Sequence, residues 1–192
     1  MEIKLTTNFT PSIEPKIGFI IHGTLGNYEG AVDWLYQPCF KRNPVSYSSA
    51  HYIIAKDGRC TQLVLNKDIA WHAGITSNPT PEALAVLPKT LLGGLKNPNN
   101  SFIGIELEWF VGDVITEEQY AMVSQIIATS GVKNPIILCH KQITDYKSDF
   151  MTSDGKIDML VVNEIKRRII PTPAVSSKED IKKQIINLIN QL

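Results

Sequence analysis

The chain has 192 residues, of which 43% are hydrophobic and 20% charged, and its 19 basic residues balance its 19 acidic residues. This length suffices for one sizeable core and is short for two domains. With no net charge and no block of like charges, the chain has no basic field that would gather phosphates, so we do not expect a nucleic-acid partner.

The apolar runs, the N-terminus and the cysteines exclude further classes. The longest apolar runs, such as residues 17–21, are far shorter than the ~20 residues of a membrane-spanning helix, so we expect no membrane span. No charged leader precedes an apolar stretch at the N-terminus, so we expect no Sec signal peptide. Cys39, Cys60 and Cys139 form no CxxC pair, which indicates neither a disulfide framework nor a cysteine-built zinc site.

The first predicted elements are a strand and a helix. Residues 16–21 are apolar and rich in isoleucine, which predicts a buried strand that stops at His22. Residues 27–37 hold apolar side chains and end before Pro38, which predicts a helix.

A hairpin and a long loop follow. Two β-rich runs, 51–55 and 60–65, flank the pair Asp57-Gly58, a pattern typical of a β-hairpin. Residues 75–100 are interrupted by proline and glycine, so we expect a loop with at most one short helix around 82–86.

The next strand carries two acids. Residues 102–108 alternate, so that Glu106 and Glu108 share one face while apolar side chains occupy the other. A Thr-x-x-Gln capping box then predicts a helix over residues 116–130.

The last elements of the main domain are a strand and a helix. Residues 136–139 predict a strand that ends at His140. Residues 141–155 are polar and predicted to be irregular, and residues 157–169 have helical apolar spacing with basic residues in the last turn.

These elements predict an α/β fold: a single domain with a central mixed β-sheet flanked by helices, a cleft at the strand ends and a C-terminal helical tail. We expect the domain over residues 1–170, a Pro/Ser-rich linker over 171–177 and an amphipathic helix over 178–192.

Two of the four histidines, His22 and His140, each follow a buried strand, where side chains reach a cleft. Asp149 stands nine residues after His140. Two imidazoles and a carboxylate are a normal ligand set for catalytic zinc, which keeps its fourth position open. An alternative interpretation stays open at this point: Asp145 and Asp149 could be loop residues that only favour solubility.

Five short motifs follow one another around these residues: Ile-Ile-His22-Gly-Thr, Ser-Ala-His51-Tyr-Ile-Ile-Ala-Lys-Asp-Gly, Ala-Trp-His72-Ala-Gly, Ser-Phe-Ile-Gly-Ile-Glu106-Leu-Glu, and Cys-His140 followed by Lys147-Ser-Asp149. In this order they resemble the zinc-dependent N-acetylmuramoyl-L-alanine amidases of the type-2 amidase and peptidoglycan-recognition-protein superfamily. The resemblance spans roughly residues 16–170.

The resemblance implies one zinc ion held by His22, His140 and Asp149. It also implies that Glu106 is the general base and that Lys147 stabilises the transition state. Chemically, a positioned carboxylate takes the proton of the attacking water, and an ammonium group favours a developing oxyanion.

The segment after His140 departs from the family's pattern. It is about one residue shorter than in bacterial members, and Phe150 and Met151 stand where proline and glycine are common. Asp145 therefore stays open as a substitute for Asp149.

Further residues have candidate roles near the same site. Glu108 shares the face of Glu106 and stays open as the base. Trp71, His72 and His51 are expected to contact the sugar or peptide of a substrate.

The implied activity is hydrolysis of the amide between N-acetylmuramic acid and L-alanine in peptidoglycan or muropeptides. The alternative is a non-catalytic muropeptide-binding module on the same fold. The sequence contains no HExxH motif that would indicate a different zinc hydrolase. Without a signal peptide, we expect synthesis in the cytoplasm and action either on cell wall after release, as a phage lysin acts, or on cytoplasmic muropeptides. The sequence indicates no oligomeric state.

Overall fold

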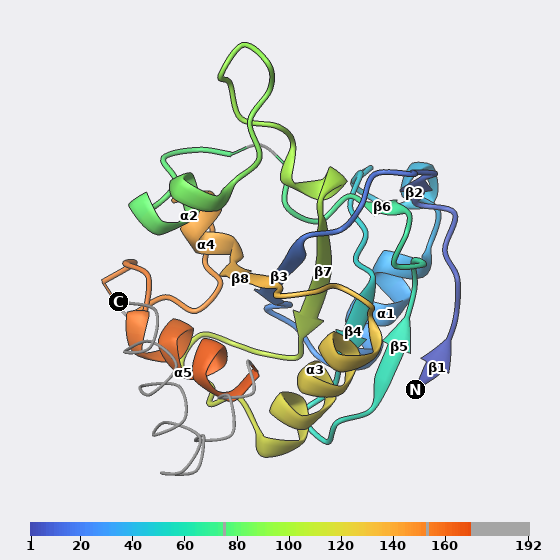
Figure 1. The fold of residues 1–192 in the computed structure, drawn as a ribbon. Coiled ribbons are helices and arrows are strands. Elements are labelled where there is room, and N and C mark those ends of the chain that lie inside the picture. The colour runs from blue at the N-terminus through green and yellow to red at the C-terminus, as the bar shows by residue number, and fades with distance from the viewer. Residues whose placement is uncertain (75, 153, 170–192) are drawn as a thin grey trace, which may run out of the picture.

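The computed structural model describes residues 1–74, 76–152 and 154–169 (Figure 1). The predicted linker at 171–177 and the predicted helix at 178–192 lie outside these residues. The described elements, in chain order, are β1 (Glu2–Ile3), β2 (Phe9–Thr10), β3 (Gly18–Gly23), α1 (Tyr28–Tyr36), η1 (Cys39–Lys41), β4 (Tyr52–Ile54), β5 (Cys60–Gln62), β6 (Ile69–Ala70), α2 (Pro81–Val86), η2 (Pro98–Asn100), β7 (Phe102–Leu107), α3 (Glu117–Thr129), β8 (Ile136–Cys139), α4 (His140–Ile143) and α5 (Met159–Ile169).

Within the described residues, a six-stranded sheet forms the centre of the domain, in the order β1-β5-β4-β7-β3-β8. Its neighbouring strands are parallel except in the β4–β5 hairpin. Strands β2 and β6 form a separate antiparallel pair. The expected mixed sheet flanked by helices is thus confirmed, with β7 and β3 in its interior.

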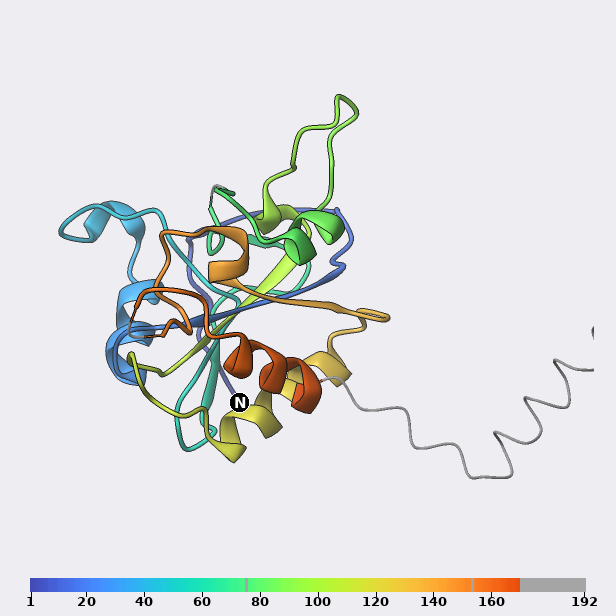
Figure 2. The same cartoon turned by 90° about the vertical axis from the view of Figure 1, so that its left-hand side faces the viewer.

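Helices cover both faces of the main sheet (Figures 1 and 2). Helices α3 and α5 pack on one face, against a cluster that includes Ile103, Ile105 and Leu107 of β7. Helices α1, α2 and α4 lie on the other face, where Phe102 belongs to the core. The predicted alternation of β7 is therefore confirmed, and it places Glu106 on the face of α1, α2 and α4.

Local sequence signals account for two of these elements. The predicted capping box opens α3: the Thr116 hydroxyl accepts from the Gln119 N–H, and the Gln119 side chain accepts from the Thr116 N–H. The turn between β4 and β5 contains Gly58 at φ +83°, a left-handed conformation that glycine adopts without strain.

The structure differs from the predicted elements in three places. Strand β3 continues through Gly23, so His22 lies inside the strand and not after it. A short helix, α4, begins at His140 in a segment expected to be irregular. Strands β1, β2 and β6 were not predicted, because two residues are too few to carry a periodic pattern.

Helices in the part of the chain that the structure describes are too short or too polar to cross a membrane.

Candidate active site

His22 and Glu106 are neighbours across two parallel strands. Strands β3 and β7 pair in a register that sets His22 opposite Glu106. His22 Nδ1 lies 4.0 Å from Glu106 Oε1. The register of the central sheet therefore fixes this pair, and a slip by one residue would turn one side chain to the opposite face.

His140 and Asp149 reach the same place from the end of β8. His140 is the first residue of α4, and Asp149 lies in the loop beyond α4. The Asp149 carboxylate accepts a 2.9 Å hydrogen bond from the Gly23 N–H, which ties this loop to the end of β3. One ligand-type atom from each of His22, His140 and Asp149 lies within 4.8 Å of the others, and all three residues are buried.

Burial holds the histidine rings of this region neutral. Desolvation lowers the pKa of His140 to about 4, with the nearby Lys147 charge acting in the same direction. Desolvation likewise lowers the pKa values of His22 and His72 well below their ordinary range. A neutral imidazole has one N–H donor and one nitrogen lone pair, so the hydrogen-bond partners decide which nitrogen is which.

A chain of hydrogen bonds assigns the ring protons. His140 Nε2 lies 3.2 Å from the Ala73 carbonyl, and His72 Nε2 lies 3.2 Å from the Phe102 carbonyl. Because a carbonyl only accepts, both rings carry their proton on Nε2. His72 Nδ1 and His140 Nδ1 are then both acceptors, 3.0 Å from His22 Nε2 and 2.9 Å from His22 Nδ1, and the single proton of His22 serves one of them. With that proton on Nε2, His22 donates to His72, and the Nδ1 atoms of His22 and His140 both carry lone pairs.

Two lone pairs and a carboxylate therefore face one another. The Nδ1 atoms of His22 and His140 are 2.9 Å apart, a separation at which two lone pairs repel. The Asp149 carboxylate adds negative charge 3.6 Å from His140 Nδ1. A cation between these atoms would turn the repulsion into attraction, so the donor set fits a metal ion.

Glu106 has the environment of a carboxyl group that exchanges protons near neutral pH. Burial raises the pKa of Glu106 to about 8, helped by the Asp149 charge and opposed by Lys147. A metal cation beside it would favour the carboxylate form. Such a group accepts a proton more readily than an ordinary exposed carboxylate.

A cleft of about 290 Å³ opens onto these groups, and its lining includes His22, Glu106, His140, Lys147 and Asp149. A second cavity, of about 480 Å³, adjoins it, since Thr24, Leu35 and Glu106 line both. The sequence-predicted ligands, base and lysine are thus brought together at one opening.

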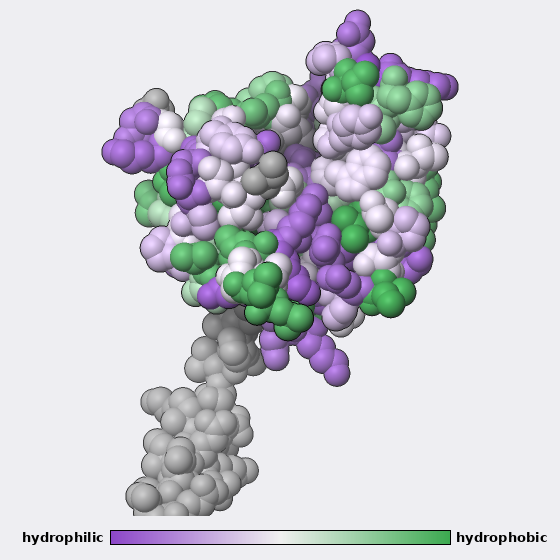
Figure 3. All heavy atoms as spheres, turned by 90° about the horizontal axis from the view of Figure 1, so that it is seen from above, coloured by the Kyte–Doolittle hydropathy of each residue, from purple (hydrophilic) through white to green (hydrophobic). Residues whose placement is uncertain are grey.

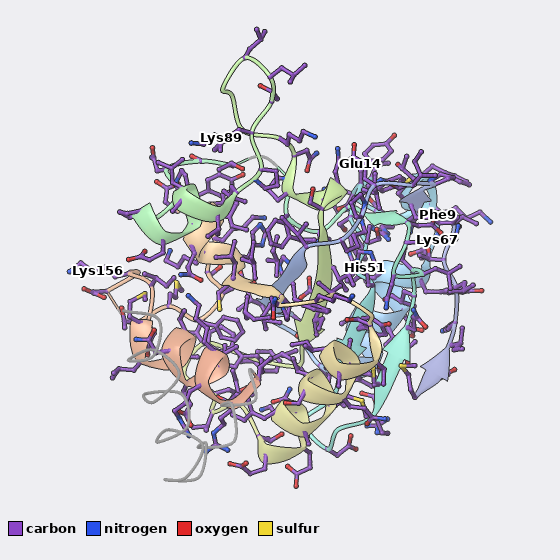
Figure 4. The ribbon with its side chains drawn as sticks, in the orientation of Figure 1. Phe9, Glu14, His51, Lys67, Lys89 and Lys156 are labelled. Carbon is purple, nitrogen blue, oxygen red and sulfur yellow. The ribbon has the colours of Figure 1, made fainter. Side chains whose placement is uncertain are left out.

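The predicted substrate-contact residues divide into two groups. Trp71 and His72 line the cleft. His51 does not, because its side chain lies inside the fold with 0% exposure (Figure 4). Its Nδ1 accepts a 2.9 Å hydrogen bond from the Gly104 N–H, and its Nε2 lies 3.1 Å from the Asp68 carbonyl. This burial contradicts the expected substrate contact of His51, because its ring is enclosed by the fold and hydrogen-bonds to the backbone instead.

The two alternative acids are engaged elsewhere. The Glu108 carboxylate accepts a 2.9 Å hydrogen bond from the Lys56 N–H. The Asp145 carboxylate is exposed and accepts a 2.8 Å hydrogen bond from the Asn78 amide. Neither of these acids lines the cleft.

The support of His22 by His72 was not anticipated from the sequence. The His72 ring lies against Gly104 of β7, where a Cβ atom would be 2.4 Å from His72 Cγ. A glycine inside an otherwise apolar strand is the sequence signal for such a close approach.

Comparisons with known proteins agree on one family and on the fold. Residues 14–152 match the family described as N-acetylmuramoyl-L-alanine amidase. The chain is 30% identical over 99 residues to the 1,6-anhydro-N-acetylmuramyl-L-alanine amidase AmpD of Haemophilus influenzae. That match covers 52% of this chain and 46% of the relative, so it spans less than half of the relative's length.

Solved structures show the same fold at low identity. A Se-Met AmpD derivative aligns with a TM-score of 0.58 and 20% identity, over 85% of this chain and 93% of the other. The catalytic domain of XlyA aligns with a TM-score of 0.54 and 14% identity, over 88% and 97%. AmiD from E. coli, in complex with anhydro-N-acetylmuramic acid-L-Ala-D-gamma-Glu-L-Lys, aligns with a TM-score of 0.50 and 22% identity, over 70% and 52%.

Proposed function

The chain belongs to the N-acetylmuramoyl-L-alanine amidase family, and on that basis we propose that it hydrolyses the amide bond between the lactyl group of N-acetylmuramic acid and the L-alanine of a peptide stem. The observation that carries the proposal is the approach of the Nδ1 atoms of His22 and His140 to 2.9 Å beside Asp149, with the half-buried Glu106 4.0 Å from His22 Nδ1.

In this proposal one zinc ion is held by Nδ1 of His22, Nδ1 of His140 and the carboxylate of Asp149. Neutral imidazoles and a carboxylate are ligands that zinc accepts in three-ligand catalytic sites. Zinc bound there would supply Lewis acidity, which polarises a carbonyl and makes water more acidic. The backbone carbonyls and His72 would hold the two imidazole rings with their lone pairs toward the ion.

Glu106 serves as the general base. Its carboxylate takes the proton of the attacking water and later gives a proton to the leaving amine of L-alanine. Lys147 lines the same cleft, and its ammonium group favours the negative charge that develops on the carbonyl oxygen. Trp71 and His72 form part of the wall against which the substrate lies.

The substrate is peptidoglycan or a soluble muropeptide. The matched relative from Haemophilus influenzae is named for a 1,6-anhydro-N-acetylmuramyl-L-alanine substrate, and the E. coli AmiD structure contains an anhydromuramyl peptide. By analogy the chain would act on cytoplasmic muropeptides or, after release, on the cell wall. The catalytic domain would span residues 1–170, with 171–177 as a linker and 178–192 as a helical tail.

Mass spectrometry of reaction products tests this proposal. The full chain, loaded with zinc, is incubated with whole sacculi and with a soluble muramyl peptide, each with and without a chelator. We expect free peptide stems beginning with L-alanine, formed only without chelator. Binding of muropeptide without any cleavage, in protein that carries zinc, would instead support the non-catalytic binding module.

A further inference from the structure

A hairpin projects from the body at the end of the sheet where β7 begins (Figures 1 and 2). We call residues 88–96 the apical hairpin. Lys89 and Leu95 pair across it as an antiparallel bridge, and the Lys96 N–H donates to the Pro88 carbonyl at 2.8 Å. Its tip is a turn in which the Gly93 N–H donates to the Thr90 carbonyl at 3.0 Å. The hairpin is therefore an ordered extension.

The tip of the apical hairpin carries two fully exposed leucines. Leu91 and Leu92 occupy the centre of the turn and have exposed fractions of 106% and 98%. Leu87 and Leu95, at the base, pack into the core beside α2 and α4. Central turn positions ordinarily hold polar residues or glycine, so the two leucines are not explained by the turn itself.

The arms of the apical hairpin are basic. Lys89 lies on one arm, at the stem (Figure 4), and Lys96 lies on the other. The sequence has no acidic residue between Glu82 and Glu106, so nothing within the hairpin neutralises these lysines. In the view from above, hydrophobic and hydrophilic surface lie directly beside each other (Figure 3).

We propose that the apical hairpin docks on an anionic lipid bilayer, with Leu91 and Leu92 inserted into the interface and Lys89 and Lys96 at the lipid phosphates. Exposed apolar side chains flanked by basic ones are the combination that interfacial binding uses. A protein partner is disfavoured, because a specific protein interface buries about 800 Å² on each side and two side chains on a convex tip supply far less.

This docking is peripheral and separate from the cleft. The apical hairpin precedes the first residue of β7, whereas Glu106 lies near the other end of that strand. Membrane contact would therefore leave the cleft free and hold the protein at the surface by a weak, reversible interaction.

Vesicle binding of the full chain tests the proposal. We measure co-sedimentation with vesicles of phosphatidylglycerol and phosphatidylcholine in equal parts, and with vesicles of phosphatidylcholine alone. We expect binding to the anionic vesicles that weakens with salt, and much weaker binding to the neutral ones.

Three variants separate the contributions. The double variant Leu91→Ser/Leu92→Ser should lower the partition coefficient more than ~10-fold, because removing even one buried leucine is worth about that factor. Lys89→Gln/Lys96→Gln should weaken binding several-fold for each lysine and reduce the salt dependence. Val114→Ser is the control, since Val114 is an exposed apolar loop residue (84%) that follows the other end of β7, and it should bind as the parent does.

A fluorescent label reports insertion directly. The three native cysteines are buried, so a Leu91→Cys variant can be labelled at the tip with an environment-sensitive dye. We expect a blue shift on adding anionic vesicles. No vesicle binding, or equal binding by the Leu91→Ser/Leu92→Ser variant, would overturn the proposal. Self-association abolished by that variant, without vesicle binding, would assign the tip to a second copy of the chain.

Discussion

Replacement of His72 examines whether the hydrogen-bond chain behind His22 contributes to metal binding. His72→Leu removes the acceptor that lies 3.0 Å from His22 Nε2. His72→Asn keeps an acceptor, because its Oδ1 is as many bonds from the backbone as His72 Nδ1. Leucine and asparagine have the same branched skeleton, so the two variants differ mainly in this acceptor.

The expected magnitude follows from the burial of the pair. In His72→Leu the His22 N–H stays buried without a partner, which costs about 1–3 kcal/mol, or roughly 5- to 150-fold in an equilibrium constant. His22 can avoid this cost by moving its proton to Nδ1, the nitrogen assigned to the metal. Loss of a group that orients a ligating histidine typically weakens metal binding about 10- to 100-fold. We expect that loss for His72→Leu, and a loss below about 5-fold for His72→Asn, where the hydrogen bond remains.

The assay is competition for zinc with a chromophoric chelator, together with ring ¹⁵N chemical shifts of the metal-free protein. We expect the parent and His72→Asn to have His22 protonated on Nε2, and His72→Leu to shift the proton toward Nδ1. Zinc binding by His72→Leu as tight as that of the parent would contradict a role for this hydrogen bond. An equal loss of affinity in both variants, with the His22 tautomer unchanged, would also contradict it, since the shape of residue 72 and not its acceptor would then matter.

Four further outcomes are expected. Glu106→Gln should bind zinc normally but lose at least ~10²-fold in kcat, whereas Glu108→Gln should change kcat little; the reverse pattern would show that the wrong carboxylate is assigned. His140→Ala should lose both zinc and turnover while remaining folded by circular dichroism, and a metal-free active preparation would contradict the ligand set. Burial lowers the pKa of His51 to about 3, so between its unfolded value of 6.5 and that pH only the unfolded chain takes up this proton. The free energy of unfolding should therefore fall by about 1.4 kcal/mol per pH unit for this group as pH drops below 6.5. Denaturant titrations at several pH values should show that the free energy of unfolding of His51→Asn depends on pH less steeply, by the equivalent of one proton. Equal pH dependence in the parent and the variant would be the contrary result. Truncation after Pro171 should leave turnover of a soluble muropeptide largely intact, and loss of turnover with the fold preserved would mean that the removed segment helps to build the site.

The local elements and the chemical types of the site residues could be predicted from the sequence alone. Alternation over residues 102–108 predicted a strand with its acids on one face, and the structure confirms that face for Glu106. The Thr116 capping box predicted the start of α3. These features depend on neighbours within about one turn or one strand, and such neighbours are adjacent in the sequence.

Which of the candidate site residues lie close together could be seen only in the folded structure. The fold sets His22 opposite Glu106 in the sheet. The Asp149 carboxylate accepts a hydrogen bond from the Gly23 N–H, and the Glu108 carboxylate accepts one from the Lys56 N–H. The fold also turned His51 from an expected substrate contact into a fully buried brace.

The reason is that strand order, register and ring protonation depend on partners far apart in the chain. His22 is separated by 50 residues from His72 and by 118 from His140. A periodic pattern in the sequence shows only which face of its own strand or helix a residue occupies. The strand or helix that packs against that face is fixed only when the sheet assembles.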